Sequence, residues 1–144
     1  MGEFFIWIPM LIMLGIATYT DLRWRIIPDK LVMVGLVYFL VLRLLYADHP
    51  YYNYLLGIAA GAGLLYAFAL YCPRAFGGGD IKLMAVVGVG FGWQWTLLIL
   101  LLTLLAIIVY ALGILLMKGR RRRRVIPMAP FFLLIVFLLN YMMM

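Results

Sequence analysis

Long apolar runs, separated by short polar or turn-forming clusters, make up almost the whole chain. Several runs approach the roughly 20 apolar residues that a helix needs to cross a hydrocarbon core about 30 Å thick. They lack the strict alternation of barrel strands, which are about 10 residues each, so we expect helices. The polar clusters divide the chain into about six predicted spans, at residues 4–19, 28–47, 54–71, 81–92, 93–117 and 125–141.

The fourth predicted span is short and rich in glycine, with Gly88, Gly90 and Gly92 close together. No polar cluster marks its boundary with the fifth span, so an arrangement of five helices with these two spans merged is an alternative. In either arrangement we expect an all-α, polytopic transmembrane bundle in which residues 1–144 form a single domain.

Composition supports a membrane protein. Of the 144 residues, 69% are hydrophobic and 12% are charged, whereas soluble domains are about 45–50% apolar and about 25% charged. The first apolar run lacks a basic n-region and an Ala-x-Ala cleavage site, so we expect a retained helix and not a removable signal peptide. The single cysteine, Cys72, cannot form an intrachain disulfide. We expect no metal site and no cofactor.

Basic residues gather in alternate loops, which is typical of cytoplasmic loops. The three basic groups are Arg23, Arg25 and Lys30; Arg74 and Lys82; and Lys118 with Arg120 to Arg124. The rule therefore predicts a multi-pass protein of the cytoplasmic membrane, with both termini and His49 outside. Arginine runs such as "KGRRRRR" also bind nucleic acid or anionic lipid. Between two hydrophobic spans the run is better explained by topology, so we expect contact with membrane lipid and none with nucleic acid.

The chain has five carboxylates: Glu3, Asp21, Asp29, Asp48 and Asp80. Glu3 and Asp48 fall at the predicted outer face, where solvated charges are normal, and we assign them no role. Asp21 directly follows the first predicted span and Asp80 opens the fourth. Two full spans lie between them, one going out and one returning, so both aspartates are predicted at the same cytoplasmic face.

Ionisable groups at membrane depth are costly and often functional. Each aspartate also has a structural explanation when considered alone. Asp21 could pair with Arg23 or Arg25, and Asp80 could complement a helix N-terminus and pair with Lys82.

Three successive glycines, Gly77, Gly78 and Gly79, lead into Asp80. They cost backbone entropy and offer no side chain for packing. We therefore expect a loop whose backbone another chain approaches closely.

Two neighbouring carboxyl groups can share one proton, and this pairing supports general acid/base hydrolysis. The ionised aspartate activates a water molecule, while the protonated one donates to a substrate carbonyl. Such a site needs no metal, no cofactor and no nucleophilic side chain. The only histidine, His49, is predicted to lie in an outer loop, far from both aspartates.

Three segments together resemble the type IV prepilin peptidase family, the GxGD-type intramembrane aspartyl proteases that include archaeal preflagellin peptidases. They are "TDLRWRIIPDKLV", "GGGDIKLMA" and "IPMAPFFLL". The resemblance covers nearly the whole chain. It implies that Asp21 and Asp80 are the catalytic pair, that Gly77 and Gly79 are the motif glycines, and that Gly78 is at the variable position.

The resemblance places Asp29 where family members also carry asparagine. Local physics agrees with a structural role, because Asp29 follows Pro28 and complements a helix N-terminus. Lys82 is a candidate for electrostatic tuning of Asp80, with snorkelling to the lipid headgroups as the alternative.

The function implied by the resemblance is removal of the short basic leader from prepilin-like membrane precursors. Longer bacterial members carry an N-terminal methyltransferase region, and this chain resembles the short, peptidase-only forms. Two other classes stay open: a transport protein that moves ions or protons through Asp21 and Asp80, and a structural subunit that would tolerate the loss of both carboxylates.

Overall fold

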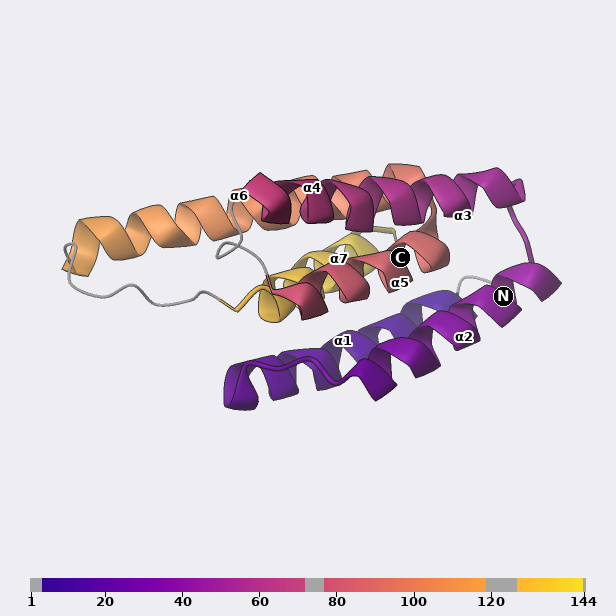
Figure 1. Ribbon diagram of the computed structural model, residues 1–144, viewed down its shortest axis with the longest axis horizontal. Coiled ribbons are helices and arrows are strands. Elements are labelled where there is room, and N and C mark those ends of the chain that lie inside the picture. The colour runs from indigo at the N-terminus through magenta and orange to yellow at the C-terminus, as the bar shows by residue number, and fades with distance from the viewer. Residues whose placement is uncertain (1–3, 72–76, 119–126, 144) are drawn as a thin grey trace.

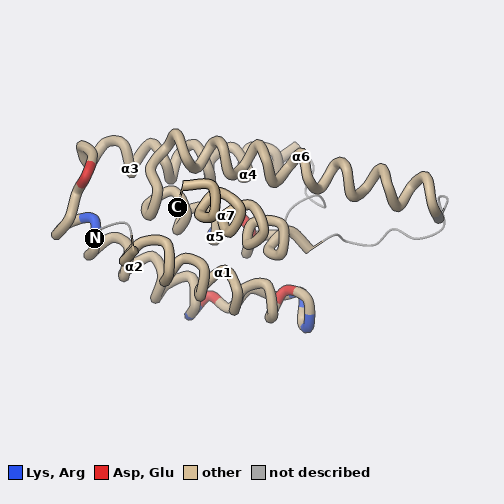
Figure 2. The backbone as a smooth tube through the Cα atoms, turned by 180° about the vertical axis from the view of Figure 1, so that it is seen from behind, with Lys and Arg blue, Asp and Glu red and all other residues tan. Residues whose placement is uncertain are grey.

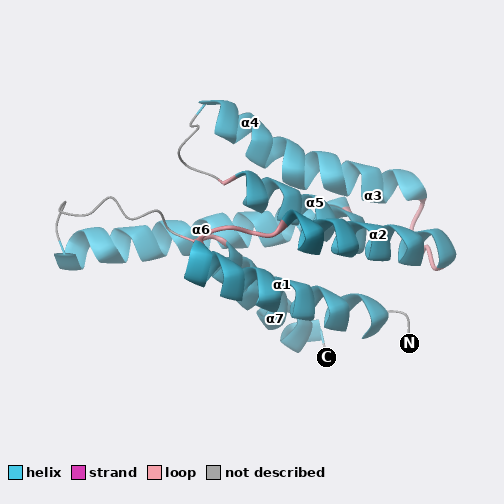
Figure 3. Cartoon of the chain, turned by 60° about the horizontal axis from the view of Figure 1, so that its bottom comes forward, coloured by secondary structure: helices cyan, strands magenta, loops and turns pink. Residues whose placement is uncertain are grey.

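The computed structural model describes residues 4–71, 77–118 and 127–143. Within these ranges the chain is all-α, as predicted, and contains six helical rods (Figure 1). In chain order the elements are α1 (Phe4–Trp24), α2 (Asp29–Leu45), α3 (Tyr51–Ile58), the π-helical turn η1 (Ala59–Gly63), α4 (Leu64–Tyr71), α5 (Gly78–Phe91), α6 (Trp93–Lys118) and α7 (Ala129–Met143). α3, η1 and α4 follow one another without a break and form a single rod (Figure 3).

Three of these rods are long and apolar enough to cross a membrane, namely Phe4–Trp24, Tyr51–Tyr71 and Trp93–Met117. α7, with 15 residues, is a shorter apolar helix. α2 and α5, with 17 and 14 residues, are also too short to be counted among the three long rods. Large apolar side chains cover the outside of the described bundle, including Ile12, Leu101 and Phe137. An outer surface of this kind is stable only in an apolar environment, so the fold is that of a membrane protein. Charged positions gather towards the helix ends, with long uncharged stretches between them (Figure 2).

Two predicted boundaries differ from the structure near the aspartates. α1 continues to Trp24, so Asp21 lies inside the helix and not after it. α5 begins at Gly78, so Gly78 and Gly79 form its first turn and are not part of a loop. The predicted sixth span starts at Val125, which lies outside the described residues, and α7 begins at Ala129.

The alternative with five helices is wrong, because α5 and α6 are separate. Gly92 stands between them with a φ of 79°, a left-handed conformation that favours glycine. The chain reverses there, and α6 packs back against α5. In Figure 1, α6 then runs on beyond the ends of its neighbours.

α5 is the central helix of the bundle. It packs against α1, α2, α3, η1 and α6, and most of its side chains are buried. α3 approaches it most closely at Gly57 and Gly88, where a Cβ on either glycine would lie 2.5 Å from the backbone of the other. Small residues of this kind let membrane helices pack with their backbones in contact. The helix that carries Asp80 is therefore held on nearly every side.

The far end of α5 is fixed by a buried arginine. Arg43 on α2 donates hydrogen bonds to the Gly90 carbonyl from Nε (3.1 Å) and Nη2 (2.5 Å). It also forms an ion pair with Asp48 at 2.7 Å, and its guanidinium lies 4.8 Å from the ring centre of Tyr54. The last carbonyls of a helix have no intrahelical partner. Arg43 thus satisfies one of them and ties α2 to the end of α5.

Candidate active site

Asp21 and Asp80 are brought together at the opposite end of α5. Asp21 lies in the last turns of α1 and Asp80 in the first turn of α5. Each side chain is buried, with a relative exposure of 9%. They are close enough for the negative charge of Asp21 to act on Asp80. The structure therefore places the two carboxylates that the sequence singled out in one electrostatic site.

Asp80 is held by the helix that it begins. The backbone N–H of Gly77 donates to Asp80 Oδ2 at 3.2 Å, so the carboxylate caps the N-terminus of α5. Burial and the nearby charge of Asp21 raise the pKa of Asp80 to about 6, although the hydrogen bond from Gly77 acts in the opposite direction. Asp80 therefore keeps a proton at pH values where an exposed aspartate is fully ionised.

Asp21 faces the N-terminus of a different helix. The backbone N–H of Ala129, the first residue of α7, donates to Asp21 Oδ2 at 3.4 Å. The first N–H groups of a helix have no intrahelical partner and carry the positive end of its dipole. Figure 3 shows α1 and α7 side by side, an arrangement that brings this N-terminus to Asp21.

Arg25 supplies a positive charge next to Asp21. Its backbone has a φ of 54°, in the left-handed region that ends helices, and its N–H donates to the Asp21 carbonyl at 2.9 Å. The chain turns there and carries Ile27 back against the start of α5.

Gly79 packs closely against the segment that contains Ile27. A Cβ at Gly79 would lie 2.9 Å from Cβ of Ile27, which is itself buried. A Cβ at Gly78 would have no neighbour within 4 Å, and a Cβ at Gly77 would have Asp80 Oδ2 as its nearest neighbour, at 3.3 Å. The premise that the three glycines have no packing role is thus wrong for Gly79. The approach that excludes a side chain there comes from the protein's own Ile27.

Lys82 pairs with Asp29, whereas the sequence suggested Asp80 as its partner. Its Nζ lies 2.6 Å from Asp29 Oδ1, and both side chains are largely exposed. This pair joins the first residue of α2 to the second turn of α5. An ion pair in such an exposed place contributes about 0–1 kcal/mol. Electrostatic tuning of Asp80 by Lys82 stays a prediction.

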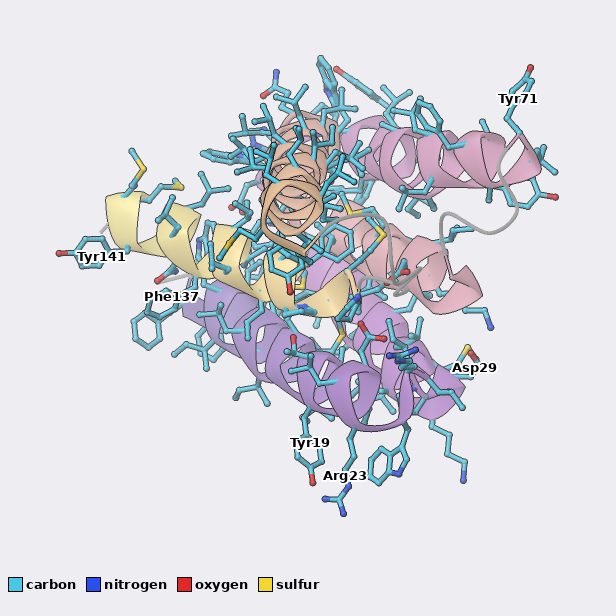
Figure 4. All side chains as sticks on the ribbon, turned by 90° about the vertical axis from the view of Figure 1, so that its left-hand side faces the viewer. Tyr19, Arg23, Asp29, Tyr71, Phe137 and Tyr141 are labelled. Carbon is cyan, nitrogen blue, oxygen red and sulfur yellow. The ribbon has the colours of Figure 1, made fainter. Side chains whose placement is uncertain are left out.

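Arg23 points away from the carboxylate pair. It donates to the Tyr19 hydroxyl at 2.6 Å, and its guanidinium lies 5.2 Å from the ring centre of Trp24. Figure 4 shows Tyr19 and Arg23 projecting together from the outer side of α1. Aromatic and basic side chains of this kind are typical of a membrane interface. The structural alternative in which Arg23 pairs with Asp21 is therefore not realised.

Two buried carboxyl groups, each accepting a hydrogen bond from a backbone N–H at the N-terminus of a helix, are suited to general acid/base chemistry. Residues 4–71, 77–118 and 127–143 contain no group of three His, Cys, Asp or Glu side chains that could hold a metal. Fold and site together define a helical membrane protein with a paired aspartate centre at one end of the bundle.

Residues 8–112 match the type IV leader peptidase family. The chain is also 30% identical, over 118 residues, to the prepilin leader peptidase/N-methyltransferase of Bacillus subtilis (strain 168). That alignment covers 82% of this chain and 48% of the Bacillus protein. No solved structure matches the chain. The chain belongs to the type IV leader peptidase family, a family of aspartic peptidases, which confirms the resemblance inferred from its motifs.

Two contacts were not predicted from the sequence, one at the carboxylate pair and one at the far end of α5. The contact between Ala129 and Asp21 joins positions 108 residues apart, and only the prolines around the start of α7 hinted at a helix N-terminus there. No role for Arg43 was predicted from the sequence. Its position on an otherwise apolar stretch of α2 was the available signal, because a charge inside such a helix needs partners.

Proposed function

We propose that this chain is an aspartyl endopeptidase that removes the short basic leader from prepilin-like membrane precursors. The observation that carries the proposal is the burial of Asp21 and Asp80 together, at the start or end of helices that the rest of the bundle holds in place. Membership of the type IV leader peptidase family supports the same activity.

In the proposed mechanism the two aspartates have different roles. Asp21 is assigned as the general base, because the N–H of Ala129 and the charge of Arg25 offset part of the cost of burying its carboxylate. Asp80 is the general acid, because its raised pKa retains a proton for the substrate carbonyl. Asp21 takes a proton from water as the water oxygen attacks the scissile carbonyl, and Asp80 gives its proton to the carbonyl oxygen, so a tetrahedral intermediate forms. The C–N bond then breaks: the leaving amine takes the proton held by Asp21, and Asp80 takes back a proton from a hydroxyl of the intermediate, which leaves a carboxyl group.

The location of the pair favours hydrolysis over transport. Asp21 and Asp80 lie at helix ends, whereas coupling sites of transporters are typically built near the bilayer midplane from broken helices. We propose that this end faces the cytoplasm, in keeping with the alternate basic loops. A basic leader would then reach the pair from the cytoplasm while the hydrophobic helix of the precursor stays in the bilayer.

The test is coexpression with candidate prepilin precursors from the same genome, scored on a gel for loss of the leader. The proposal expects a shortened product only when the wild-type protein is present. If every precursor keeps its leader beside well-expressed wild-type protein, the proposed activity is wrong.

A further inference from the structure

Thr18 lies one turn before Asp21 on the buried face of α1. The two side chains have the same relative exposure of 9%. Residues three apart are neighbours on a helix surface. Helical side chains also lean towards the N-terminus, so the Asp21 carboxyl group extends over the turn that contains Thr18. The hydroxyl of Thr18 is therefore a side-chain donor on the same face of α1 as the Asp21 carboxyl group.

Thr18 behaves differently from the other buried threonines of the described helices. Thr20, Thr96 and Thr103 each donate a hydrogen bond to a backbone carbonyl three or four residues earlier, at 2.9, 2.6 and 2.6 Å. Thr18 Oγ1 is shielded from solvent and has no hydrogen-bond partner in the described part of the chain. A threonine in a helix usually satisfies its hydroxyl by bonding to the preceding turn. The Thr18 hydroxyl is thus left available for another acceptor.

Asp21 offers a matching acceptor. Among the described residues its carboxylate accepts one hydrogen bond, from Ala129, and that bond is long at 3.4 Å. A carboxylate can accept about four hydrogen bonds, and well-formed ones are about 2.7–3.2 Å long. Hydrogen bonds at catalytic groups are often long in a free enzyme and shorten when substrate binds.

We propose that Thr18 is a positioning residue whose hydroxyl donates to the Asp21 carboxylate in the working enzyme and fixes its orientation towards the attacking water. This inference rests on the proposed function. Asp21 would then be held from two sides, by the N–H of α7 and by the hydroxyl of its own helix. The spacing of three residues on one helix makes the two side chains neighbours on the surface of α1.

The experiment compares Thr18→Val, Thr18→Ser and Thr20→Val as full-length proteins in detergent. The substrate is a purified precursor that carries a basic leader before an apolar helix. Valine keeps the shape of threonine without the hydroxyl, and serine keeps the hydroxyl. Thr20→Val is the matched control, because the Thr20 hydroxyl bonds only within its own helix turn.

Thr18→Val should lower kcat by about tenfold or more and change KM by less than about twofold, because the lost bond acts on the reacting group. Thr18→Ser should restore most of kcat, and Thr20→Val should resemble wild type. The melting temperature of Thr18→Val should equal or exceed that of wild type, because the hydroxyl removed has no partner in the described structure.

Three results would overturn the inference: an unchanged kcat for Thr18→Val, a loss that serine does not restore, or a rise in KM at constant kcat, which would indicate a substrate contact. If Thr18→Val fails to accumulate, Thr18→Ala provides the same comparison with less demand on packing. A wild-type protein that cleaves no precursor contradicts the proposed function itself. An active wild type with a fully active Thr18→Val contradicts only the role of Thr18.

Discussion

Gly79 is limited by its contact with Ile27, and this contact gives a residue-scale prediction. A Cβ at position 79 would lie 2.9 Å from Ile27 Cβ, an atom that cannot move aside without the backbone. Gly79→Val should therefore lower stability by about 1–3 kcal/mol and reduce cleavage with it. Gly78→Ala is the matched control, because nothing lies within 4 Å of its Cβ position. Melting temperature and cleavage rate of the purified variants provide the measurement.

A Gly79→Val protein that is stable but inactive would contradict this explanation. If Gly79→Val melted like wild type and yet cleaved nothing, the limiting neighbour would be the substrate and not Ile27. The original expectation of a close substrate approach would then be correct.

The raised pKa of Asp80 predicts a falling limb in the pH–rate profile. Burial and the charge of Asp21 raise this pKa to about 6. Raising the pH through that value removes the proton that the acid must donate, so cleavage should decline, approaching about tenfold per pH unit well above the pKa. Initial rates between pH 5 and 8, with protein integrity checked at each pH, provide the measurement. A rate that increases steadily over this range would exclude Asp80 as the acid.

At the scale of elements, α5 is held at both ends by polar contacts, and Arg43 secures the end far from Asp80. Arg43→Ala leaves the Gly90 carbonyl without its charged donors and should cost about 2–3 kcal/mol. Asp48→Asn is the matched control, because Asp48 is largely exposed and its ion pair contributes about 1 kcal/mol or less. Melting temperatures in detergent test the difference. Equal values for Arg43→Ala and wild type would show that α5 does not depend on this contact.

The helices themselves were predictable, because long apolar runs in a chain of this composition can satisfy their backbone groups only as helices. The return of Asp21 and Asp80 to one face followed from counting the spans between them. The extension of α1 past Asp21 did not follow, because charged residues in a last helical turn look the same in sequence as residues of a loop. The role of Gly79 was also hidden, because its neighbour Ile27 belongs to a different segment.

At the scale of the whole molecule, the proposed orientation puts the site on the cytoplasmic side. Single cysteines in a Cys72→Ser background, at Arg23, Arg122 and His49, should react differently with an impermeant maleimide applied to intact cells. Only the cysteine at His49 is expected to react, since the proposed orientation keeps the basic loops inside. Arg122 lies outside the described residues, so labelling adds information there. Reaction of a cysteine at Arg122 would show that the protein has the opposite orientation in the membrane.

The central claim is that Asp21 and Asp80 act as one catalytic unit. Asparagine keeps the size of aspartate but cannot ionise or transfer a proton, so Asp21→Asn, Asp80→Asn and the double variant test chemistry with little change in packing. Asp29→Asn is the control, because Asp29 is exposed and pairs with Lys82.

The measurement is the rate of leader cleavage by equal amounts of each purified protein. Each single variant should lose cleavage, and the double variant should be no worse than either, because groups that act as a unit are strongly non-additive. Asp29→Asn should keep most of its activity. An active Asp80→Asn protein would contradict the account, and an inactive Asp29→Asn beside an active Asp21→Asn would show that Asp80 has a different partner.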